Sequence, residues 1–108
     1  MFNKWSFLAS FALFLKGNAE FEKGNKIMTV LFPRNQKIIV HAYSEDEFSK
    51  RMNQMDSVII YYNLAESFYK QVKLAKAYDQ AVLKENLESL KFNLDVVQKE
   101  QMILKAEH

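Results

Sequence analysis

From Ser44 to His108 the chain holds neither glycine nor proline, the two residues that most often interrupt a helix. Apolar residues recur every three or four positions along this segment, which predicts an amphipathic helix. This apolar stripe consists of Val58, Tyr62, Ala65, Tyr69, Val72, Leu83, Leu87, Leu90, Leu94, Val97 and Leu104. It fades over residues 76–80 and then resumes in phase. We therefore predict a mainly α protein, dominated by one long helical region at 44–108.

The start of this region carries a capping box at Ser44 and Glu47. The Ser44 hydroxyl can accept from the backbone N–H of Glu47, and the Glu47 carboxylate can reach back to the N–H of Ser44. Tyr43 and Phe48 stand at the two positions of a hydrophobic staple. The acids at 45–47 also offer ligands for a metal or an acid–base pair, but the capping pattern favours a helix start.

A straight helix over this region would be about 90 Å long, and it could not bury its own apolar stripe. We expect it to self-associate as a coiled coil, with a break expected near residues 53–57. The polar residues at 76–80 are a second candidate break. The alternative is that the region folds back on itself as a helical hairpin.

The predicted interaction face combines residues of this stripe with the neighbouring aromatic residues Tyr61 and Phe68. Its residues are Tyr61, Tyr62, Phe68, Tyr69, Val72, Leu83, Leu87, Leu90, Leu94 and Val97. Tyrosines of this kind can form a platform for a peptide, a glycan or a partner helix, because each joins apolar area to a polar tip. The other interpretation is an ordinary core or oligomer seam, which helical spacing alone would produce.

The first 19 residues read as a signal peptide. Lys4 forms the basic region, residues 5–15 the apolar region, and small residues precede a cleavage point before Glu20. A retained membrane anchor is the second interpretation, although the apolar run is shorter than the roughly 20 residues that span a bilayer. A core helix of a soluble protein is the third.

Between this segment and the long helix we expect a polar linker at 20–26 and a β-hairpin at 27–43. The two apolar runs, Ile27–Phe32 and Lys37–Tyr43, are rich in β-branched residues. Pro33 suits the first corner of the turn between them. A lone hairpin is marginal in water, so it would lean on the long helix or on a partner.

Charge limits the classes of partner. The chain has 15 basic and 13 acidic side chains, and the excess lies entirely in the first 19 residues, at Lys4 and Lys16. The remainder is balanced, so no general attraction to nucleic acid is expected. One local cluster, Lys70, Lys73 and Lys76, could touch anionic lipid or polymer, but it is also typical of a solvated helix face. The absence of cysteine excludes disulfides and thiolate zinc sites.

Nothing in the sequence favours catalysis. The chain has only two glycines and lacks a phosphate-binding loop, an HExxH pattern and a nucleophile elbow. Apart from the C-terminal residue, His41 is the only histidine. We predict no catalytic residue, no metal site and no cofactor.

We expect a small exported helical interaction or structural protein of a bacterial or phage-encoded envelope system. It would act by self-association and by binding an envelope protein partner, in the periplasm or at a membrane. Two alternatives stay open: a membrane-anchored accessory protein of lysis, exclusion or secretion, held through residues 5–15, and a compact inhibitor-type binding module. A cytoplasmic location is the alternative to export.

Overall fold

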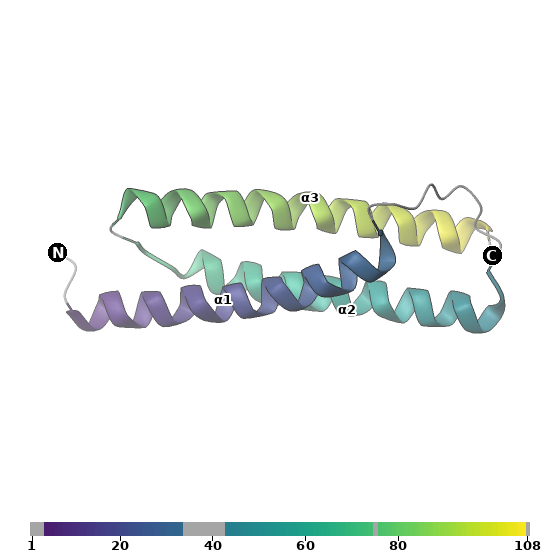
Figure 1. Ribbon diagram of the computed structural model, residues 1–108, viewed down its shortest axis with the longest axis horizontal. Coiled ribbons are helices and arrows are strands. Elements are labelled where there is room, and N and C mark those ends of the chain that lie inside the picture. Colours follow the sequence, from purple (N-terminus) through teal and green to yellow (C-terminus); the bar gives the residue numbers. More distant parts are fainter. Residues whose placement is uncertain (1–3, 34–42, 75, 108) are drawn as a thin grey trace.

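The computed structural model of this chain describes residues 4–33, 43–74 and 76–107, with side chains from residue 8 onward. This part of the chain forms three helices: α1 (Lys4–Leu31), α2 (Glu45–Lys70) and α3 (Ala77–Glu107). They lie side by side in alternating directions and make a rod of 56 × 22 × 19 Å (Figure 1). The mainly α class is confirmed.

Each helix turns one seam of alternating three- and four-residue steps toward the other two, as in a coiled coil. The seam residues are Ser10, Phe14, Gly17, Phe21, Gly24, Met28 and Leu31 in α1, Met55, Val58, Tyr62, Ala65, Tyr69 and Val72 in and just after α2, and Leu83, Leu87, Leu90, Leu94, Val97, Gln101 and Leu104 in α3. All of them are buried or partly buried. The chain thus buries its apolar stripe against its own helices.

The predicted β-hairpin at 27–43 is wrong. Its first run lies within and just beyond the last turn of α1, and the described residues contain no strand. Met28 and Leu31 continue the α1 seam from Gly24, so packing on α2 outweighs the β propensity of this run. Pro33 lies directly after the end of α1, where a proline stops a helix. Most of the second run lies outside the described residues.

The single long helix is also wrong, because the chain turns between α2 and α3. Residues 53–57, the expected break, are helical in α2, and Met55 is fully buried there. The chain instead leaves the helix after Lys70, at residues 71–74, and residues 77–80 form the first turn of α3. Buried Leu74 anchors the connection, and its carbonyl accepts from Gln80 Nε2 at 2.6 Å. The chain therefore turns at a buried leucine, without a glycine or a proline in the turn.

The start of α2 follows the predicted capping pattern. Ser44 is the N-cap, and its Oγ accepts from the Glu47 N–H at 3.2 Å. The Glu47 carboxylate accepts from the Ser44 hydroxyl at 3.0 Å, where we had expected it to bond the Ser44 backbone. Tyr43 and Phe48 both pack on the core. The acids at 45–47 are exposed and flank this cap.

Residues 4–19 belong to α1 and are not set apart from the rest of the described chain. From Ser10 onward the seam of α1 packs on α2, and Phe14 and Gly17 are buried. This arrangement gives no support to a signal peptide. Within the described part of the chain, none of the helices has the length and apolarity that crossing a membrane requires.

Candidate interaction site

Two buried tyrosines of α2 lie against the two glycines of α1. A Cβ atom added to Gly17 would lie 2.5 Å from Tyr69 Cε1, and one added to Gly24 would lie 2.6 Å from Tyr62 Cε1. Both distances are too short for real carbon atoms, so only glycine fits under these rings. Because Gly17 and Gly24 have no side chains, α1 and α2 can approach each other closely at these two positions.

Around Tyr69, hydrogen bonds join side chains of all three helices, and we call this group the Tyr69 layer. The Tyr69 hydroxyl donates to Asn18 Oδ1 at 2.6 Å. Asn86 Nδ2 from α3 approaches the same Oδ1 at 3.3 Å and the Tyr69 hydroxyl oxygen at 3.4 Å. Phe14 and Phe21 pack beside the ring at centroid distances of 6.1 and 6.4 Å.

The Tyr62 layer repeats this arrangement seven residues along each helix. The Tyr62 hydroxyl donates to Asn25 Oδ1 at 2.5 Å, and Asn93 Nδ2 donates to the hydroxyl oxygen at 3.1 Å. Burial raises the pKa of Tyr62 and Tyr69 above 10.0, and the bonds from Asn93 and Asn86 partly offset this rise in pKa. Both hydroxyls therefore keep their protons and act as donors through the neutral range.

These layers were missed in the sequence, although their spacing is visible there. Gly-Asn occurs at 17–18 and again at 24–25, tyrosine at 62 and 69, and asparagine at 86 and 93. A shared step of seven residues on three helices indicates two stacked polar layers in a coiled-coil core. Such layers favour one register, because a shifted helix would leave buried amides and hydroxyls without partners.

The structure places most residues of the predicted interaction face inside the protein. Tyr62, Tyr69, Leu90 and Val97 are fully buried. The others are partly buried: Tyr61, Phe68, Val72, Leu83, Leu87 and Leu94. Tyr61 lies near Lys23 of α1, whose ammonium is 5.6 Å from the ring centroid. The face is therefore brought together, but inside the bundle: its α2 and α3 residues pack against each other and against α1.

Two open grooves flank α3. The first, which we call the α1–α3 groove, is lined by Asn25, Met28, Thr29, Phe32, Phe92, Asn93 and Val96. None of these seven side chains is charged. Phe92 stands at the rim and is 69% exposed. The groove begins where the Tyr62 layer ends, since Asn25 and Asn93 belong to both.

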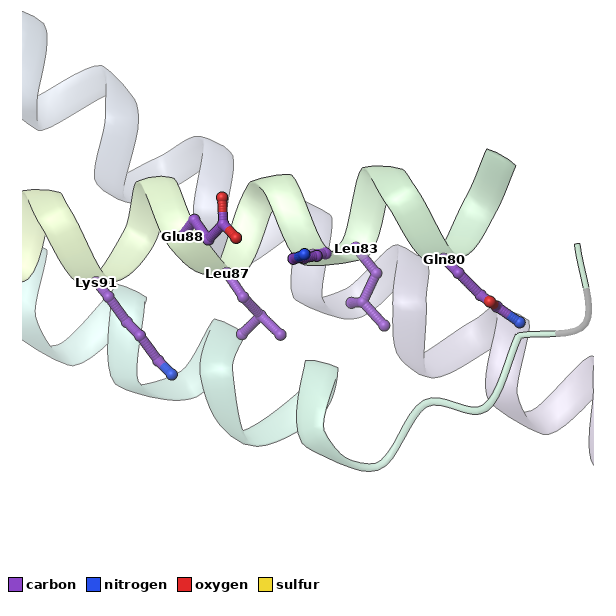
Figure 2. A pocket seen from close by; sticks show the side chains of 6 residues that line it. Gln80, Leu83, Leu87, Glu88 and Lys91 are labelled. Carbon is purple, nitrogen blue, oxygen red and sulfur yellow. The ribbon is translucent and has the colours of Figure 1, made fainter. Parts of the chain in front are cut away.

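The second groove, the α2–α3 groove, lies on the other side of α3 (Figure 2). Leu83 and Leu87 form its apolar floor, and both belong to the predicted interaction face. Figure 2 shows them between Gln80 and Lys91, on the side of α3 toward the end of α2. Lys84, Glu88 and Lys91 give it a rim with charges of both signs.

Neither groove resembles a reactive centre. Among the described residues, histidine and acidic side chains do not gather in any group of three that could hold a metal ion. His41 lies outside the described residues. The grooves offer apolar area with polar edges, which suits binding to another surface.

The chain matches no protein-family model, no curated protein and no solved structure.

Proposed function

We propose that this chain is a helical interaction protein that self-associates through the α1–α3 groove and does not catalyse a reaction. The observation that supports this proposal is Phe92, a large aromatic side chain that is 69% exposed beside an uncharged apolar groove. Exposed aromatic residues next to a hollow are typical of protein interfaces.

A second copy fits the chemistry of this groove. Two copies related by a two-fold axis near Phe92 would let each exposed ring pack into the other groove, against Met28 and Phe32. Because the lining residues carry no charge, such a contact would not bring like charges together. Seven residues are fewer than the roughly 20–30 per partner of a standard interface, so we expect a weak dimer.

The test is the mass of the purified full chain in solution, measured by sedimentation over a range of concentrations. The wild-type chain should dimerise at micromolar to submillimolar concentration. Phe92→Glu should remain a monomer with unchanged helicity, because it places a charge in the contact.

Ile60→Glu is the matched control, because Ile60 is 58% exposed on α2 and lies outside both grooves. It should dimerise like the wild-type chain. A wild-type chain that stays monomeric at the highest concentration, or dimers that survive Phe92→Glu, would contradict self-association through this groove.

A compact binding module is the second candidate function, and the α2–α3 groove favours it. Its leucine floor and mixed-charge rim suit one face of an amphipathic helix from another protein. This candidate predicts a monomer that binds its partner through Leu83 and Leu87. A monomeric wild-type chain in the sedimentation test would therefore favour it.

Export to an envelope stays a prediction. Cleavage before Glu20 would remove Phe14, Gly17 and Asn18, and with them the α1 side of the Tyr69 layer. The intact mass of the chain recovered from its host would test this prediction. A mass starting at Glu20 would support export, and a mass that retains Met1 in the soluble cytoplasmic fraction would count against it.

A further inference from the structure

The N-terminal half of α1 presents apolar side chains outward as well as inward. Leu8, Phe11 and Leu15 are 46%, 40% and 52% exposed. Their spacing of three and four residues places them on one side of the helix, away from the buried Ser10 and Phe14. We call these three residues the outer stripe. No charged residue occurs between Lys4 and Lys16.

The outer stripe lies at the basic end of the rod. Residues 1–19 contain Lys4 and Lys16 and no acid. The segment between α2 and α3 contains two more lysines, Lys73 and Lys76, and no acid. Lys70, at the end of α2, is paired with Glu66 at 3.1 Å. The Lys73 backbone N–H donates to Ser10 Oγ, with 3.3 Å between the two heavy atoms. The connection therefore lies at the same level of the rod as the stripe, although it contacts the buried side of α1. Lys73 and Lys76 are both exposed.

We propose that this end of the rod docks on the surface of an anionic lipid bilayer. The outer stripe would enter the boundary between headgroups and acyl chains, and the surrounding lysines would contact the anionic headgroups. This mode needs no helix that crosses the membrane, in keeping with the hydropathy of the described helices. The two parts of the site, the exposed apolar area and the exposed Lys16, Lys73 and Lys76, both favour this partner.

Charge distinguishes an anionic bilayer from the other possible partners of the outer stripe. A second copy seated on the stripe would face lysines with lysines, whereas the uncharged α1–α3 groove has no such conflict. A soluble polyanion would neutralise the lysines but would leave Leu8, Phe11 and Leu15 in water. An anionic bilayer surface would neutralise the lysines and would also remove the three apolar side chains from water. This inference is independent of self-association through Phe92.

Flotation of the full chain with lipid vesicles tests the proposal, after its mass has shown that Met1 is retained. One set of vesicles contains phosphatidylcholine alone and the other adds phosphatidylglycerol. The chain should float with the anionic vesicles, should not float with the neutral ones, and should be released as salt rises.

Variants then test the two parts of the site. Leu8→Gln, Phe11→Gln and Leu15→Gln together should weaken binding at least tenfold, while circular dichroism shows that the helices remain. Lys73→Gln and Lys76→Gln should each weaken it about fivefold. Ile60→Gln with Leu64→Gln is the matched control, because both are exposed apolar residues of α2, and it should bind like the wild-type chain.

Three results would overturn the proposal: no binding to anionic vesicles, equal binding to neutral vesicles, or full binding by the triple variant. A lipid-free dimer that the triple variant abolishes would assign the stripe to a second copy instead. Phe92→Glu should still bind vesicles, so loss of self-association and loss of docking are distinguishable.

Discussion

At the scale of single residues, the two glycines of α1 determine how the helices pack. Glycine weakens a helix by about 1 kcal/mol relative to alanine, yet Gly17 and Gly24 both lie inside α1 and are buried. Each is covered by a tyrosine ring that bonds the asparagine next to it. The cost in helix propensity is offset by close packing and by hydrogen bonds that need this short distance.

Gly17→Ala and Gly24→Ala should therefore destabilise the protein, although alanine is the better helix former. Each added methyl group would overlap a buried ring, and overpacking of this kind costs about 1–3 kcal/mol. Urea unfolding followed by circular dichroism would measure the change. Ala19→Gly, at an exposed position of the same helix, gives the propensity effect alone. Stabilisation by Gly17→Ala or Gly24→Ala would mean that the rings lie elsewhere.

At the scale of elements, the sequence predicted the features that depend on the local residue pattern. It did not predict the features that depend on packing against another helix. The helical periodicity of residues 58–69 and 83–104 and the cap at Ser44 are local, and both are confirmed, whereas Val72 lies beyond the end of α2. Residues 27–31 of the β-branched run are helical because Met28 and Leu31 pack in the core of the bundle, which no local rule reveals. The turn at 71–74 has no breaker residue and depends on burial of Leu74.

Arg51 shows how the elements are fastened at the other end of the rod. Its guanidinium donates from Nη2 to the Leu31 carbonyl at 3.1 Å, where α1 ends, and lies 4.0 Å from Glu100 of α3. The same group lies 5.4 Å from the ring centroids of Phe32 and Tyr43. A cation suits the C-terminal end of a helix, so Arg51 of α2 holds α1 and α3 together.

Arg51→Ala should lower the free energy of unfolding by about 2–4 kcal/mol, because it removes a charged hydrogen bond and two ring contacts. Arg51→Lys should recover only part of this loss, since an ammonium cannot reproduce the planar guanidinium. Thermal and urea unfolding would measure both variants. Lys50→Ala, at the exposed neighbouring position, should change stability by no more than about 0.5 kcal/mol. An equally small effect of Arg51→Ala would show that this contact does not join the helices.

At the scale of the whole molecule, the chain buries its own apolar stripe and leaves three surfaces exposed: the α1–α3 groove, the α2–α3 groove and the outer stripe. The stripe of α2 and α3 is buried, but its two halves pack against each other and against α1, which the sequence pattern had suggested was a leader. Amphipathic spacing shows that a face must be buried and does not show which surface buries it. The uncharged α1–α3 groove and the basic end with its outer stripe both depend on α1 being part of the bundle.

The most direct test of this arrangement is the NMR spectrum of the two glycines. The chain contains only two glycines, so their Hα signals can be assigned without crowding. If α1 packs on α2 as described, ring currents should shift the signals of Gly17 and Gly24 upfield, and nuclear Overhauser effects should link them to Tyr69 and Tyr62 respectively. Glycine signals at ordinary helical positions, with no contact to a tyrosine ring, would contradict the packing of α1 and both surfaces that depend on it.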